Sequence, residues 1–336
     1  MMKYRVNYFS AIIICMHCFS MVHAQKSGYH ITKTFHIAGA GGWDYLAVNG
    51  RELYVSHGNQ VNILDKRTGD STGIIRNTTG VHGIAFIPEM NRGYISNGKI
   101  NTVTVFELST HKIITQIATG QNPDAILYEP FFKKIITCNG RSNDLSIIDP
   151  ATETVTTTIP VGGKPETAVS NELGKLFVNI EDKNEIVEVD LNKKTVTHHW
   201  PLTPAEGPTG LAFDKESKRL FSGCDHLLTV IDANSGKLID KLAIGEGCDG
   251  VAFDQKTKTI FTSNGSGTIT VISEQAADKY SIVDNVITKR GARTIALDES
   301  AHVLYLPTAD LEQTTVANKR PAMVPGTFQV LVVENN

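Results

Sequence analysis

Seven positions of this chain carry side chains that can ionise or bind a polar ligand, and they recur at intervals of 38–44 residues. They are Asp44, His82, Asp124, Glu166, Thr209, Asp249 and Arg293. If the segments between these positions are structural repeats arranged in a circle, the seven residues lie around one opening, and we call them the first ring. They include four carboxylates, a histidine and an arginine. Gathered carboxylates raise one another's pKa and attract cations. The alternative is that these residues cap turns and bond to neighbouring backbone amides. We predict that they bind a ligand, and we assign none of them a catalytic role.

A second ring of positions follows the same period at the predicted ends of other strands. Its members are His57, Asn97, Asn139, Ile180, Cys224, Asn264 and Thr308, of which His57 and the three asparagines are the candidate ligands. Glycine follows each asparagine, and the Asn-Gly dipeptide is typical of turns, which favours a structural role. Amides and carboxylates that converge on one channel could instead hold a calcium-type cation. A transition metal could be held by Asp44, His57 and His82. A divalent cation is therefore the one cofactor considered, without an assigned site.

Short β-strands must position these residues, because four apolar runs recur in each repeat of about forty residues. The first run is small and apolar, as at residues 210–213 and 250–253. The last run alternates apolar residues with Thr and Lys, as at 112–117, which is typical of a sheet edge with one wet face. This pattern predicts an all-β protein, a seven-bladed β-propeller of four-stranded blades.

The seventh repeat lacks a fourth strand, because the chain ends soon after the apolar residues 328–333. Residues 29–39 are similar to the fourth strand at 112–120. We expect this N-terminal strand to pair into the last blade and close the ring, which protects the sheet edges. The same blade has an insertion at residues 308–327. Loops of this length are commonly functional or disordered, so we expect a lid or a partner-binding loop.

The first 24 residues differ from the repeats. Lys3 and Arg5 precede an apolar stretch that ends in small residues before Gln25. This is the pattern of a secretory signal peptide cleaved near Ala24/Gln25. A membrane anchor is the alternative, but the apolar run is short. We predict a signal peptide over 1–24 and one propeller domain over 25–336, located in the periplasm or secreted, with no membrane span in the mature chain.

The charge balance of the chain bears on which partners it can bind, and its cysteine content bears on whether it forms a disulfide. Lys and Arg total 32 against 35 Asp and Glu, and this balance disfavours nucleic acid as a partner. Three cysteines remain in the predicted mature chain. Cys224 and Cys248 should lie on the same face in neighbouring blades, so an oxidising compartment would permit a disulfide between them. Cys138 is expected to be a small buried residue.

Tetrapeptides at the ends of the second strands carry a family resemblance. Residues 94–97, 136–139 and 261–264 read Tyr-Ile-Ser-Asn, Ile-Thr-Cys-Asn and Phe-Thr-Ser-Asn. They resemble the Tyr-Val-Thr-Asn motif of the YVTN-repeat (YncE-like) β-propeller family. Residues 291–298 and 323–328 resemble an exported bacterial branch of that family. The resemblance covers residues 29–334 and implies a seven-bladed exported propeller. Its members have varied binding roles, so it implies no reaction.

Several catalytic motifs do not occur in the sequence, among them the P-loop, His-Glu-x-x-His and the Cys-x-x-Cys-His site of covalent haem. We therefore expect an exported, non-enzymatic module that binds a small molecule or an exported protein at its loop-rich central face, as a monomer. The alternative is a calcium-type metal-dependent hydrolase or lactonase that uses the axial carboxylates, an analogy at the level of fold only. A quinoprotein-like redox role ranks lowest, because only Trp43 and Trp200 are present.

Overall fold

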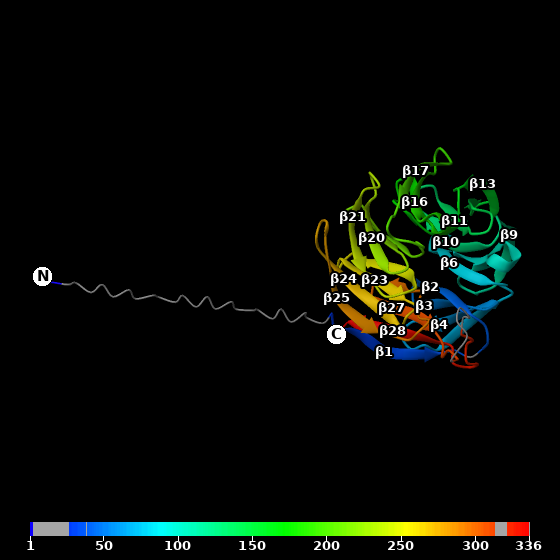
Figure 1. The fold of residues 1–336 in the computed structure, drawn as a ribbon. Coiled ribbons are helices and arrows are strands. Elements are labelled where there is room, and N and C mark those ends of the chain that lie inside the picture. Colours follow the sequence, from blue (N-terminus) through cyan, green and yellow to red (C-terminus); the bar gives the residue numbers. More distant parts are fainter. Residues whose placement is uncertain (3–26, 38, 313–320, 336) are drawn as a thin grey trace.

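The computed structural model describes residues 1–2, 27–37, 39–312 and 321–335. Their strands form seven four-stranded antiparallel sheets, one for each repeat, arranged around a common centre (Figure 1). Each innermost strand contacts the innermost strand of the next blade, and that of blade seven contacts that of blade one. The predicted seven-bladed β-propeller is therefore confirmed, and the described residues contain only short 3-10 turns as helix.

The blades follow the chain, and within each blade the strands run in order from the axis outward. Blade one contains β2 (Trp43–Asn49), β3 (Glu52–His57), β4 (Gln60–Asp65) and β5 (Ser71–Arg76). Blade two contains β6 (Val81–Ile87), β7 (Arg92–Asn97), β8 (Thr102–Glu107) and β9 (Ile113–Ala118). Blade three contains β10 (Pro123–Glu129), β11 (Lys134–Asn139), β12 (Asp144–Asp149) and β13 (Thr154–Pro160). Blade four contains β14 (Pro165–Ser170), β15 (Lys175–Ile180), β16 (Glu185–Asp190) and β17 (Thr195–Pro201).

The last three blades have the same plan, but the outermost strand of blade seven comes from the other end of the chain. Blade five contains β18 (Leu211–Asp214), β19 (Arg219–Gly223), β20 (Leu227–Asp232) and β21 (Leu238–Ala243). Blade six contains β22 (Cys248–Asp254), β23 (Thr259–Asn264), β24 (Thr268–Ala276) and β25 (Lys279–Ile287). Blade seven contains β26 (Ala296–Asp298), β27 (Val303–Thr308), β28 (Gln329–Asn335) and β1 (Tyr29–His36).

The second and third strands of each blade are buried on both faces, which explains why their sequences are almost continuously apolar. Leu53, Tyr54 and Val55 of β3 are fully buried, because sheets pack face to face on either side of the strand. The outermost strands bury only some of their residues, as in β9, so they alternate apolar with polar side chains. Seven apolar clusters, which lie mainly between neighbouring blades, form the core.

The ring is closed as the sequence predicts, by the N-terminal strand. β1 pairs antiparallel with β28, from Tyr29 opposite Asn335 to His36 opposite Gln329. A second contact joins blade one to the segment that leads into blade seven, because the indole Nε1 of Trp43 donates a 3.2 Å hydrogen bond to the carbonyl of Gly291. Both contacts, the β1–β28 pairing and the Trp43 hydrogen bond, therefore connect the N-terminal part of the chain with the C-terminal part.

Two predicted segments lie wholly or partly outside the described residues. The signal peptide at 1–24 falls almost entirely on residues 3–26, of which the structure describes nothing. The insertion at 308–327 does separate β27 from β28, but residues 313–320 are not described. Its two described arms pair through a bridge between Leu311 and Met323. Among the described residues, no helix is long and apolar enough to cross a membrane.

Candidate functional site

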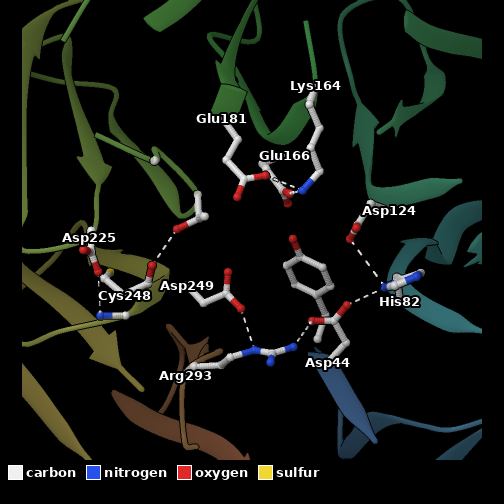
Figure 2. A pocket seen from close by; sticks show the side chains of 14 residues that line it. Asp44, His82, Asp124, Lys164, Glu166, Glu181, Asp225, Cys248, Asp249 and Arg293 are labelled. Carbon is white, nitrogen blue, oxygen red and sulfur yellow. Dashed lines mark hydrogen bonds and ion pairs between the residues drawn. The ribbon is translucent and has the colours of Figure 1, made fainter. Parts of the chain in front are cut away.

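The turns that lead into the innermost strands place the first-ring residues around a cavity of about 580 Å³ at one end of the axis (Figure 2). All seven first-ring residues line it, so the structure brings the predicted set together. Further lining residues not assigned from the sequence include Tyr45, Lys164, Glu181 and Asp225. Each lies within two positions of a residue in one of the two rings, which is the signal that could have identified them.

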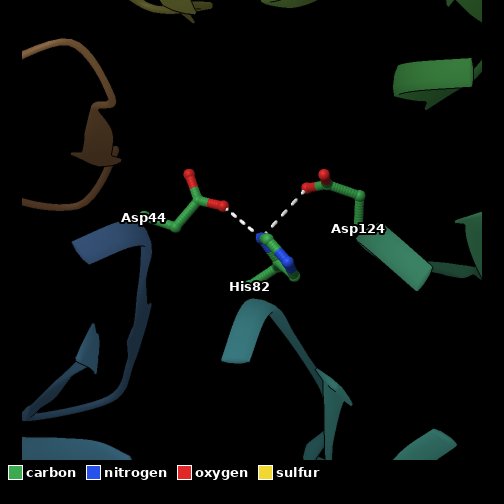
Figure 3. Close-up of side chains that lie close together, drawn as sticks. All are labelled: Asp44, His82 and Asp124. Carbon is green, nitrogen blue, oxygen red and sulfur yellow. Dashed lines mark hydrogen bonds and ion pairs between the residues drawn. The ribbon is translucent and has the colours of Figure 1, made fainter. Parts of the chain in front are cut away.

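Two carboxylates from blades one and three flank the histidine of blade two (Figure 3). The Nδ1 atom of His82 lies 2.5 Å from Oδ2 of Asp44 and 3.6 Å from Oδ1 of Asp124. Burial lowers the pKa of His82, but the hydrogen bond with Asp44 and the charge of Asp124 outweigh burial and raise it. Gly98 permits this position of the ring, because a Cβ atom there would lie 2.6 Å from Nε2 of His82.

Arg293 connects two further carboxylates on the wall of the cavity. Its Nε lies 2.6 Å from Oδ2 of Asp249, and its Nη2 lies 3.7 Å from Oδ1 of Asp44. Burial raises the pKa of Asp249, the charge of Arg293 opposes this, and Asp44 adds to the increase. The guanidinium thus compensates part of the negative charge between blades one and six.

A third charged group lies in blade four. Nζ of Lys164 forms ion pairs with both Glu166 and Glu181. One ammonium cannot neutralise two carboxylates, and Glu166 is also buried and near Asp124. Burial first, and then the charge of Asp124 and the hydrogen bond with Glu181, raise the pKa of Glu166 to about 9, although Lys164 opposes the shift.

The cavity as a whole is acidic. Its lining has six carboxylates but only two permanent cations, Lys164 and Arg293, in addition to His82. Burial and the charge of Asp44 raise the pKa of Asp124 to about 7. Among the described residues, the Asp124 carboxylate accepts no hydrogen bond, and its ion pair with His82 is 3.6 Å long. This end of the axis therefore favours a cation or a proton.

The second ring does not line this cavity, and its asparagines are internal braces within their blades. The amides of Asn97, Asn139 and Asn264 are fully buried. Each donates to oxygens of the neighbouring third strand, as Asn97 does to Thr104 at 2.8 Å. Their buried NH2 groups thus bond within the blade and do not face the cavity, which is the structural role that the Asn-Gly pattern favoured.

The sequence analysis named Asp44, His57 and His82 as possible ligands of one transition metal, and of these three His57 does not lie with the other two. His57 is buried against Phe328, with ring centroids 4.1 Å apart, and its Nδ1 lies 3.3 Å from Oδ1 of Asn62. Asp124 takes the third position, and the donor atoms of Asp44, His82 and Asp124 all lie within 4.8 Å of one another. The error arose because the ring position of His57 marks the end of a strand without specifying which way its side chain points.

Hydroxyl groups bond the backbone of four first-ring residues and of Cys248, next to a fifth, a role that the sequence analysis did not predict. A hydroxyl in one blade donates to the backbone carbonyl at the turn of the next blade. The pairs are Ser56 to His82, Ser96 to Asp124, Thr209 to Cys248, Ser263 to Arg293 and Thr294 to Asp44. Serine as the last residue but one of the second strand, in blades one, two and six, was the available signal for three of these pairs. Cys138 stands at this position in blade three.

We expect Ser96→Ala to lower the free energy of unfolding by about 1–3 kcal/mol, because it leaves buried polar groups without partners. The Ser96 hydroxyl accepts from the amide of Gly83 at 2.8 Å and donates to the carbonyl of Asp124. Urea denaturation measures the change. Ser235→Ala, at an exposed turn, is the control and should stay within about 0.5 kcal/mol. An equal effect of both substitutions would show that the Ser96 bonds contribute nothing.

The predicted disulfide is not formed in the structure, which has Cys138, Cys224 and Cys248 as free, buried thiols. The two candidate partners point at different backbone carbonyls. Sγ of Cys224 lies 3.8 Å from the carbonyl of Ser222, and Sγ of Cys248 lies 3.6 Å from that of Gly250. Burial raises the pKa of Cys224 to about 12, so this thiol is protonated and unreactive at neutral pH.

Comparison with known proteins identifies the fold and no family. No family model matches this chain, and no curated protein matches it in sequence. Among solved structures, a chain of Kuenenia stuttgartiensis hydrazine synthase has a TM-score of 0.70, covering 81% of this chain and 94% of that chain. The two are 16% identical in sequence. A likeness at this identity concerns the propeller architecture alone.

Proposed function

We propose that this chain is an exported binding module of the YVTN-repeat type, whose axial cavity binds a small ligand that carries a cationic group. The observation that carries the proposal is the 580 Å³ cavity lined by six carboxylates and two permanent cations. Its volume is in the range of small-molecule sites. Export is supported by the N-terminal pattern, and the YVTN type by the tetrapeptides at the strand ends.

The charge distribution favours an organic cation over a neutral ligand. Asp124 has no hydrogen-bond donor among the described residues, and Asp249 shares its guanidinium partner with Asp44. Tyr45 adds an aromatic ring to the lining, and such a ring attracts a cation to its face. An ammonium group of a ligand would therefore replace solvent beside carboxylates whose negative charge the protein balances only in part.

Spermidine is a suitable probe for this proposal. We expect isothermal titration calorimetry to show saturable binding, weakened at least tenfold in Asp249→Asn, because one carboxylate partner of the cation is lost. Glu299→Gln removes an exposed carboxylate beyond the end of β26 and should change the affinity less than twofold. The absence of saturable binding, or equal weakening in both variants, would contradict a cation-binding cavity.

A metal-dependent hydrolase or lactonase is the second candidate, and one observation favours it. The raised pKa of Asp124 lies near neutrality beside the His82 imidazole, and groups with such pKa values suit general acid–base chemistry. The binding module ranks first because the charged side chains that line the cavity are sufficient to bind a charged ligand, whereas hydrolysis requires a metal ion in addition. The hydrolase requires a bound divalent cation, and a protein that binds none would exclude it.

A further inference from the structure

We propose that Asp44, His82 and Asp124 bind one first-row divalent transition-metal ion, of the zinc type, in the wall of the axial cavity. This inference rests on the proposed function in that the ion would occupy part of the same ligand cavity. It takes the place of the calcium-type site and of the His57 ligand that the sequence suggests. The site draws one side chain from each of three consecutive blades (Figure 3).

The distances between the donor atoms suit a small cation. The three side chains each offer one nitrogen or oxygen, and these atoms lie within 4.8 Å of one another. Ligands of a tetrahedral zinc ion, with bonds of about 2.1 Å, are about 3.4 Å apart. His82 Nδ1 is already 3.6 Å from Asp124 Oδ1 and 2.5 Å from Asp44 Oδ2. Small side-chain rotations are therefore sufficient, without movement of the backbone.

The backbone at this site is held in place before any ion binds. Hydroxyls of Thr294, Ser56 and Ser96 bond the carbonyls of Asp44, His82 and Asp124 respectively. Each carbonyl belongs to a different blade, so the ring itself sets the separation of the three ligands. A preorganised set of ligands loses less conformational entropy on binding than a flexible one.

The environment of the Asp124 carboxylate also favours a cation at this site. Its side chain is only 15% exposed, and among the described residues it accepts no hydrogen bond, while Nδ1 of His82 lies 3.6 Å from its Oδ1. A carboxylate that is largely removed from solvent is stabilised by a nearby cation, and among the described residues only the His82 imidazole lies beside this one. A cation placed between Asp124, Asp44 and His82 would supply the missing partner.

The donor set distinguishes among cations. Calcium takes six to eight oxygen ligands, whereas this site offers two carboxylates and one imidazole nitrogen. Imidazole suits zinc, copper, iron and nickel. All three side chains also line the cavity, so positions left open by three protein ligands would face its contents. The ion could thus accept water or an anionic group of the ligand held by the rest of the cavity.

The test uses tag-free protein, stripped with a chelator and titrated calorimetrically with zinc chloride and separately with calcium chloride. We expect one zinc ion per chain, with no measurable calcium binding at the same concentrations. His82→Gln and Asp124→Asn should each weaken zinc binding at least thirtyfold. His36→Gln, which removes an exposed histidine of β1, should leave it unchanged. Circular dichroism establishes that each variant is folded.

The outcome is separable from that of the proposed organic ligand. Asp249→Asn should retain zinc binding, because Asp249 lies outside the three-residue site, while it weakens spermidine binding. Failure of the folded wild-type protein to bind zinc, or zinc binding that survives His82→Gln, would overturn the metal site alone. Zinc binding without any spermidine binding would instead contradict the organic ligand and leave the metal site standing.

Discussion

A chain that lacks residues 29–36 is expected to lose its cooperative unfolding transition at 25 °C or to associate into oligomers. These residues are the whole of β1, which completes blade seven through its pairing with β28. Deletion would expose the backbone edge of β28, and exposed edges pair with other chains. It would also remove Tyr29 and Phe35, which are 9% and 5% exposed.

The energy involved is large compared with the stability of a typical domain. Each buried side chain of this size contributes about 1.5–3 kcal/mol, and the eight-residue strand adds a ladder of hydrogen bonds. Native domains have only about 5–15 kcal/mol in total. The single substitution Phe35→Ala should therefore already cost about 3–5 kcal/mol, because its ring packs in the cluster between blades one and seven.

Thermal unfolding followed by circular dichroism, with size-exclusion chromatography, measures both effects. Lys33→Ala is the matched control, since its side chain is exposed on the same strand, and it should leave the melting temperature nearly unchanged. A truncated protein that remains monomeric and melts like the full chain would show that β1 does not hold the ring together.

The second prediction concerns Glu166, whose removal should stabilise the protein at alkaline pH. Its pKa is raised from 4.5 to about 9 in the folded chain, mainly by burial. A carboxyl group with a higher pKa in the folded than in the unfolded state binds its proton more tightly when folded. Its contribution to stability therefore falls as the pH rises from about 4.5 to about 9. Glu166→Gln, which resembles the protonated form, removes this loss.

We expect Glu166→Gln to raise the free energy of unfolding by about 2 kcal/mol at pH 8 and by much less at pH 4.5. The pKa shift alone would give a gain of about 1.4 kcal/mol for each pH unit between the two pKa values. The expected gain in the free energy of unfolding is smaller, because Gln cannot form the ion pair with Lys164. Chemical denaturation at both pH values measures it, with Glu299→Gln as the exposed control. A variant that is less stable than wild type at pH 8 would show that the Lys164 ion pair outweighs burial.

The architecture and the first ring of residues around the cavity were both predictable from the sequence, because each depends on a period. The repeat of about forty residues predicts one blade per unit, and the fourth strand missing after residues 328–333 predicts closure by β1. A position that recurs once per blade must recur around the axis. This is why Asp44, His82 and Asp124, far apart along the chain, were expected at one opening and are found there.

Only the tertiary structure decided which of these polar side chains face one another. Successive residues of a strand point to opposite faces, so His57 and the second-ring asparagines, at the strand ends, point between or into blades. No period in the sequence specifies such orientations. Lys164 and Glu181 belong to no ring and meet only because the turn before β14 lies beside the end of β15. The repeat thus determined where the chain passes, while packing between neighbouring blades determined where its side chains point.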